Sequence, residues 1–200
     1  MENKFKVKSA ALTDLPQILA VYERARRFMK ANGNESQWGL PSPGKSVWPS
    51  EEALVQRIND GTLYLCVTDA CLPTEACGAE QDAVCVTDTA GEKIAAVFGH
   101  AIGDDPVYRT IFDGSWPEGS EHYGTIHMIA SSNIVHGAAS YCFDWALKQC
   151  NVLRIDTHPN NKPMRSLLEK CGFTYCGKII FEDVQNEDKL RVAFCKMINI

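Results

Sequence analysis

The stretch from Arg154 to Gly177, RIDTHPNNKPMRSLLEKCGFTYCG, constrains the fold of this chain more than any other segment. Apolar side chains recur at helical spacing after Pro163, and one face of the predicted helix carries Met164, Leu167, Leu168 and Cys171. Asn160 and Asn161 suit the start of this helix, and Gly172 suits the position just after its end. The segment therefore predicts a strand, a turn, a helix over 162–171 and a second strand.

Length and composition fit one soluble globular domain over residues 1–200. With a net charge of −5, the chain lacks the basic balance that a nucleic-acid partner would favour. No apolar run approaches the length of a membrane span, and the N-terminal lysines are not followed by an apolar signal core. We therefore expect a cytoplasmic protein without nucleic-acid or membrane partners.

The nine cysteines contain no C-x-x-C pair, so neither a zinc site nor a disulfide framework is expected. Several of them, such as Cys66 and Cys142, stand in apolar runs, where a free thiol behaves as a small hydrophobic side chain. We expect reduced, mostly buried thiols and no bound metal.

The predicted elements follow the order β-α-α-β-β-β-α-β-α-β-β. Strands are predicted at 5–9, 63–67, 84–86, 94–101, 123–130, 152–157, 173–181 and 190–197, and helices at 15–30, 51–61, 137–150 and 162–171. The long stretch 69–92 reads as either one loop or a hairpin. This order indicates a mixed α/β fold with antiparallel strands at both ends of a central β-α-β-α unit.

The spacing of Asn161, Met164, Leu167, Gly172 and Phe173 resembles the N-x-x-A-x-x-L-Y-x-x-x-G-F signature of the GNAT (GCN5-related) N-acetyltransferases. Met164 replaces the usual Ala and Leu168 the usual Tyr. Any β-turn-α-turn-β unit could give a similar heptad, but the element order resembles the family over nearly the whole chain. The Y-G-T-I-H and I-D-T-H-P-N-N segments resemble a small bacterial subgroup. The resemblance implies a mostly antiparallel sheet with helices on both faces.

Acetyl-CoA is the co-substrate that this resemblance implies. Its pyrophosphate would meet free N–H groups at a helix start, and its pantetheine arm a strand edge. The family loop R/Q-x-x-G-x-G/A aligns with 134–139, where Ile134 replaces the Arg or Gln; His136 is either a phosphate contact or a surface residue. The implied cofactor-binding residues are Ile129, Ala130, Ser131, Ile134, Val135, His136, Gly137, Ala138, Ala139, Asn161, Met164 and Leu168.

The implied reaction is the attack of a neutral amine on a thioester. The backbone of Ala130 is the candidate for polarising the carbonyl, and His127 is a candidate base because the ordinary pKa of histidine suits the task. His158, or a carboxylate acting through water, are alternatives for the base. Cys171, one turn along the same helix face, is a further catalytic candidate near the leaving sulfur, although core packing is its favoured role. Core roles for His127 and Cys171 stay open. Leu168 has no proton to give, but a thiol is a tolerable leaving group.

Loop aromatics are the predicted acceptor-binding residues: Trp38, Tyr108 and Trp116. They could equally fasten their loops to the core. The leading interpretation is an acetyl-CoA-dependent N-acetyltransferase that acts on an amine of a small molecule or peptide. The alternative is a GNAT-like protein that binds acetyl-CoA without transfer, as a sensor or structural partner. The oligomeric state stays open, with a homodimer as one option.

Overall fold

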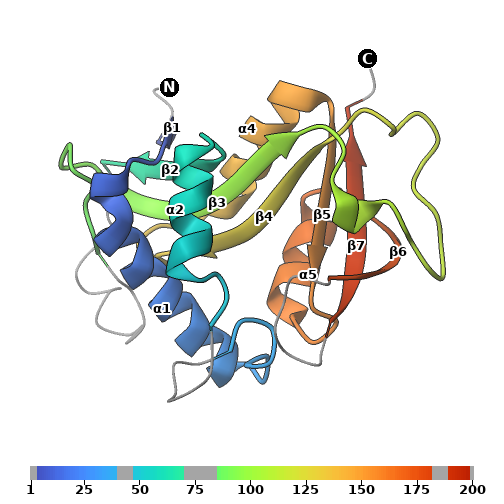
Figure 1. Cartoon of the computed structure of the whole chain (residues 1–200), viewed down its shortest axis with the longest axis horizontal. Coiled ribbons are helices and arrows are strands. Elements are labelled where there is room, and N and C mark those ends of the chain that lie inside the picture. The colour runs from blue at the N-terminus through green and yellow to red at the C-terminus, as the bar shows by residue number, and fades with distance from the viewer. Residues whose placement is uncertain (1–3, 40–46, 70–84, 182–188, 199–200) are drawn as a thin grey trace.

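The structure, a computed structural model, describes residues 4–39, 47–69, 85–181 and 189–198 (Figure 1). Its elements, in chain order, are β1 Lys6–Ser9, η1 Leu12–Asp14, α1 Leu15–Ala31, α2 Glu51–Asn59, β2 Leu63–Thr68, β3 Lys93–Ile102, η2 Pro106–Tyr108, β4 Gly124–Ser131, α4 Ala138–Cys150, β5 Val152–Thr157, α5 Lys162–Lys170, β6 Thr174–Ile180 and β7 Leu190–Met197.

The described strands form one seven-stranded sheet in the order β1-β2-β3-β4-β5-β7-β6. All neighbours are antiparallel except β4 and β5, which run parallel. These two central strands pair only at Gly124–Ile126 against Leu153–Ile155. Beyond that point they diverge, and Figure 1 shows the separation as a gap in the middle of the sheet.

Helices cover both faces of the sheet, which confirms the predicted mixed and mostly antiparallel architecture (Figure 1). Strand residues alternate between the two faces. Leu63 and Leu65 of β2 pack with Tyr22 of α1 on one face. The opposite face of the sheet packs with Phe143 of α4 and Leu168 of α5. A third apolar cluster lies over β5, β6 and β7 on the α1–α2 side and includes residues that follow β3.

Local signals set several element ends as predicted. The Ser50 hydroxyl accepts a hydrogen bond from the Ala53 N–H at 3.2 Å and begins α2. Asn161 begins α5 in the same way, with its Oδ1 atom 3.3 Å from the Met164 nitrogen. Gly172, just beyond α5, has φ = +80°, a conformation that glycine adopts without strain.

The strand predicted at 84–86 is wrong for the residues described. Val86 belongs to no strand, and Thr87 forms only an isolated bridge with Lys93. The physical reason is a tight turn: the Asp88 carboxylate accepts hydrogen bonds from the N–H groups of Ala90 and Glu92, so the chain reverses at once. Val84 and residues 70–83 lie outside the described residues.

Candidate active site

A bulge in β4 marks the place where the central strands part. Met128 has φ = +56°, which is uncommon for a residue other than glycine, and the register with β3 shifts opposite it, between Val97 and Gly99. The Tyr22 hydroxyl of α1 donates a hydrogen bond to the Met128 carbonyl oxygen at 2.8 Å. The bulge thus re-aims the backbone of β4 at the edge of the gap.

Backbone hydrogen bonds between β3 and β4 alternate along the strand, and this alternation shows which N–H groups of β4 face the gap. The Ser132 N–H donates to the Ala95 carbonyl at 3.0 Å, and Ala130 pairs with Val97. In an antiparallel pair alternate residues point to the same neighbour, so Ala130 directs its N–H at β3, and Ile129 directs its own into the gap. The N–H group at the edge of the gap is therefore that of Ile129 and not that of Ala130, and the polarisation of a carbonyl there stays a prediction.

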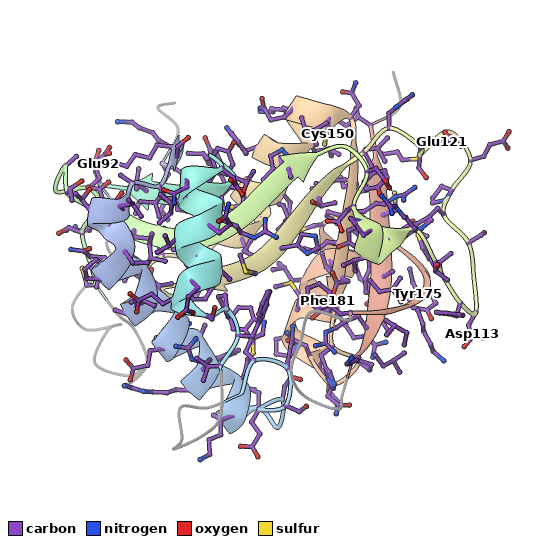
Figure 2. All side chains as sticks on the ribbon, in the orientation of Figure 1. Glu92, Asp113, Glu121, Cys150, Tyr175 and Phe181 are labelled. Atoms are coloured by element: carbon purple, nitrogen blue, oxygen red, sulfur yellow. The ribbon has the colours of Figure 1, made fainter. Side chains whose placement is uncertain are left out.

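A pocket opens beside this gap on the α1–α2 side of the sheet. It is lined by residues of β4 and β5, by the start of α5, by α1 and the segment after it, and by the ends of β6 and β7. Its aromatic walls are Trp38, Trp48 and Phe181. Figure 2 shows Phe181 between the half of the molecule that carries α1 and α2 and the half that carries β6 and β7. The pocket therefore joins elements that are distant in sequence.

An acid–base cluster forms one wall of the pocket. The Nε2 atom of His127 lies 2.8 Å from Asp105 Oδ2, and its Nδ1 atom lies 3.7 Å from Asp156 Oδ1. The Tyr108 hydroxyl donates to the same Asp156 oxygen at 2.8 Å. The Tyr108 and His127 rings are stacked, with their centres 5.5 Å apart and their planes at 10°. His127, which is 8% exposed, thus sits between two carboxylates.

Burial and charge set the protonation of this cluster. Burial alone would raise the pKa of Asp105, but the hydrogen bond and charge of His127, the Val107 N–H and the charge of Arg57 outweigh it and hold the pKa below its usual range. Burial, followed by the Asp156 carboxylate, raises the pKa of Tyr108 well above its usual value. Near neutral pH, Asp105 is therefore ionised and Tyr108 is a hydrogen-bond donor.

The loop before α4 offers backbone donors to an anion. Within the described residues, the N–H groups of residues 134–137 have no hydrogen-bond acceptor. The side chains of Ile134 and Val135 are buried in the core, so the backbone is left to face outward, and Ala138 is likewise buried while Ala139 is partly buried. Gly137 has φ = +92°, and an added Cβ there would meet nothing closer than 3.9 Å. These features suit the binding of an anion at the start of a helix.

Asn161 is held from two sides. Its Oδ1 atom caps α5, and its Nδ2 atom donates to Gln37 Oε1 at 3.0 Å, an oxygen that also accepts from Asn34 Nδ2 at 2.7 Å. Met164 is partly buried and lines the pocket together with Asn161. Both residues therefore lie at the pocket, and their predicted contact with the cofactor stays a prediction.

Other predicted site residues lie away from the pocket. Leu168 is fully buried in the apolar core beneath α5. Cys171 has its sulfur 3.4 Å from the Ser140 hydroxyl, between α5 and α4. The ring of Trp116 lies under the guanidinium of Arg154, 4.1 Å from its centre. His136 is exposed on the loop before α4. Trp38, by contrast, lines the pocket and also packs in the core, whereas Tyr108 contacts Asp156 through its hydroxyl; acceptor binding by either residue stays a prediction.

Sequence reasoning missed two residues of the site, Asp105 and Gln37. It also missed the position of Asp156 beside His127 and Tyr108. The Asp-Pro at 105–106 gave only a turn signal, and Asp156 stood in an apolar strand with no marker of its partner. Among the described residues no group of His, Cys, Asp and Glu side chains is placed to hold a metal ion. In the same residues no helix combines the length and apolarity needed to span a bilayer.

Solved structures share this arrangement of elements. A GNAT-family acetyltransferase from Streptococcus agalactiae is 22% identical, with a TM-score of 0.74 over 98% of this chain and 96% of that chain. A GNAT-family acetyltransferase from Listeria monocytogenes is 16% identical, with a TM-score of 0.58 over 97% and 95%. A chain of the NatC complex bound to Gag peptide and CoA is 13% identical, with a TM-score of 0.52 over 98% and 100%.

Sequence comparison adds nothing to this likeness: no family model and no curated protein sequence matches the chain. The structural likeness spans nearly the whole of both chains in each case. The predicted resemblance is thereby confirmed at the level of the fold.

Proposed function

We propose that this chain, which has the GNAT fold, transfers an acetyl group from acetyl-CoA to the primary amine of a small molecule. The observation that carries the proposal is the gap between β4 and β5, with the Ile129 N–H on its edge and the pair of His127 and Asp156 beside it. A thioester in this gap would have a hydrogen-bond donor at its carbonyl and a proton acceptor at the incoming amine.

Acetyl-CoA would lie along β4 and across the start of α4. The backbone of Ile129 and Ser131 faces the gap, where it could pair with the pantetheine amides as an added strand does. The N–H groups of residues 134–137 would hold the pyrophosphate, helped by the helix dipole of α4. Because Ile134 stands where the family has Arg or Gln, the anion would be held by backbone groups without that side chain.

The transfer would proceed by direct attack. His127 takes one proton from the ammonium group of the acceptor, and the amine nitrogen then forms its bond to the thioester carbon. The Ile129 N–H stabilises the negative charge that develops on the carbonyl oxygen. When the carbon–sulfur bond breaks, the thiolate takes the second proton from the former amine. A leaving thiol with an ordinary pKa of about 8.5 needs no separate acid.

The pocket walls favour an acceptor with an apolar or aromatic body. Trp48 and Phe181 meet edge to face at 5.9 Å, and Phe181 lies 6.1 Å from the His127 ring. A ring or alkyl group against these walls would place its amine near Asp156, which attracts a cation. Aromatic walls with one carboxylate suit an arylalkylamine better than a highly charged polyamine.

Two measurements test the proposal in order. Isothermal titration with acetyl-CoA, with CoA and ATP as controls, should give micromolar binding of acetyl-CoA and none of ATP. Release of free CoA is then followed with a panel of arylalkylamines, alkylamines, amino acids and polyamines. Binding without turnover of any amine would favour the alternative of a cofactor-binding protein that lacks transfer, and Leu168 is the feature that points that way. Absence of binding would reject both.

A matched pair of glycine variants locates the cofactor. Gly137→Ala forces a side chain onto a backbone with φ = +92° within the donor loop, whereas Gly91→Ala does so at φ = +83° in a turn with open space around it. The backbone strain is similar, but only the first disturbs the N–H groups before α4. Acetyl-CoA affinity should fall in Gly137→Ala and stay unchanged in Gly91→Ala. Equal affinities would place the pyrophosphate elsewhere.

A further inference from the structure

We infer that Asp105 is a positioning residue that fixes the orientation and tautomer of His127. The segment between β3 and β4 would then belong to the acid–base machinery of the site. This inference rests on the proposed transferase function. Asp105 would act through His127 without touching the acceptor amine.

The hydrogen-bond geometry assigns the proton on the ring. A carboxylate can only accept, so Nε2, 2.8 Å from Asp105, carries the hydrogen in the neutral ring. The lone pair then lies on Nδ1. This atom is 3.7 Å from Asp156 Oδ1, which is too far for a hydrogen bond. Because both His127 and Asp156 line the pocket, an ammonium group bound to Asp156 would come within reach of the basic nitrogen.

Both oxygens of Asp105 are engaged. Oδ2 meets His127, and Oδ1 accepts the Val107 N–H at 3.1 Å at the start of η2. The backbone N–H of Asp105 donates to the Tyr123 hydroxyl at 3.0 Å. A carboxylate held at both oxygens and at its backbone cannot rotate away from the imidazole. This is the pre-organisation that a proton acceptor needs when charge develops on it.

The remainder of the connection between β3 and β4 is bonded to strands β5 and β6. Phe112 and Lys178 of β6 exchange two backbone hydrogen bonds of 2.8 Å. Arg154 of β5 lies over the Trp116 ring and donates to the Ser120 carbonyl at 2.8 Å. These contacts lie on both sides of the turn that follows η2. They explain how a connection between two strands can hold a carboxylate at a fixed distance from His127.

Charged groups approach His127 from several elements. Asp105 approaches from the η2 side and Asp156 from β5, and Tyr108 adds a neutral phenol. Two positive groups oppose them: Arg57 of α2, which acts on Asp105, and Arg191, which lines the pocket. Asp105 is the carboxylate in hydrogen-bond contact with the ring, so its loss should affect His127 more than the loss of the other charged groups.

Activity assays on matched variants test the inference. Asp105→Asn keeps the shape but removes the charge, Asp105→Glu keeps the charge, and Asp104→Asn changes an exposed neighbour paired with Arg109. We expect Asp105→Asn to lower kcat by about 100-fold. Its acetyl-CoA affinity should stay unchanged. Partial recovery is expected in Asp105→Glu, and wild-type behaviour in Asp104→Asn.

A spectroscopic measurement separates this inference from the proposed function. Nitrogen-15 NMR of the ligand-free protein reads the tautomer of His127 whether or not any amine is acetylated. The proton is expected on Nε2 in the wild type, and its signal should change in Asp105→Asn. A proton on Nδ1 in the wild type would overturn the inference. So would an unchanged kcat in Asp105→Asn when the wild-type protein is active.

Discussion

Gln37 and Asn161 are 124 residues apart in the chain, yet the Asn161 side-chain amide donates to the Gln37 carbonyl oxygen at 3.0 Å. Both side chains are buried and both line the pocket. Gln37 belongs to the segment after α1, whereas Asn161 begins α5. This bond therefore ties the two sides of the candidate site together.

Loss of that bond should destabilise the protein. Gln37→Ala leaves the buried Asn161 amide without its acceptor, which should lower the free energy of unfolding by about 1–3 kcal/mol. Gln56→Ala is the control, because the Gln56 amide bonds Asp60 on the exposed face of α2 and its loss should cost less than about 0.5 kcal/mol. Urea unfolding measures both variants. Equal losses would show that the buried bond contributes nothing special.

Local signals made the fold predictable, because they act over a few residues. The cap at Asn161, the apolar face of α5 and the stop at Gly172 all lie within a dozen residues of one another, and the structure places each as expected. Apolar periodicity likewise indicated the other helices and most strands. The strand at 84–86 failed because a turn that begins at Asp88 overrides its apolar residues.

The site was less predictable because its bonds join distant segments. No sequence signal links Asp105 to His127, which come together only after β3 and β4 pair. The bulge at Met128 contains no glycine that would signal it in the sequence, yet its one extra residue changes the register, so the N–H of Ile129 and not that of Ala130 faces the gap. Trp116, expected either to bind the acceptor or to fasten its loop to the core, packs on a buried arginine.

A close approach of two backbones explains the glycine at position 177. It has φ = +145°, and an added Cβ would lie 2.6 Å from the Phe112 carbonyl oxygen, a backbone atom that cannot swing aside. Gly177→Ala should therefore cost about 1–3 kcal/mol from overpacking in addition to backbone strain. Gly103→Ala is the control, since φ is +123° there but no atom lies within 4 Å. If thermal unfolding shows equal losses, the contact with Phe112 is unimportant.

The pair of Lys8 and Asp88 should make stability depend on pH at the acid end. Burial would raise the pKa of Asp88, but the hydrogen bond from Lys8 and the N–H groups of Glu92 and Ala90 lower it below its usual value. A carboxyl whose folded pKa is depressed stabilises the fold above its unfolded pKa of about 3.9. That contribution is lost as pH falls through the folded pKa.

Asp88→Asn should therefore reduce stability at pH 6 and have little effect at pH 2, if the fold persists there. The gap between wild type and variant in urea midpoints, followed across this range, measures the contribution. Asp60→Asn removes an exposed carboxylate near the end of α2 and should leave a small, nearly constant gap. A gap for Asp88→Asn that stays constant with pH would contradict the assignment.

Trp48 should set the preference for the acceptor. It lines the pocket and lies against Phe181, so Trp48→Ala removes apolar surface that an arylalkylamine would cover. The KM for such an amine should rise by about tenfold or more, while acetyl-CoA affinity stays unchanged. Trp145→Ala is the control: this tryptophan of α4 packs with Tyr64 and Phe98 on the opposite face of the sheet. A parallel rise in KM for both variants would indicate a general loss of structure.

Leu168→Tyr tests whether the tyrosine that the GNAT signature has at this position could act in this chain. Its side chain is fully buried in the core, so a phenol at this position would have to displace apolar neighbours before it could reach the gap. Leu168→Tyr should lower the free energy of unfolding by about 1–3 kcal/mol without raising kcat. Leu167→Tyr, at a partly exposed position on the same helix, should cost less. A stable Leu168→Tyr variant with a higher kcat would mean that this position does face the thioester, and that the proposed transfer lacks an acid it can use.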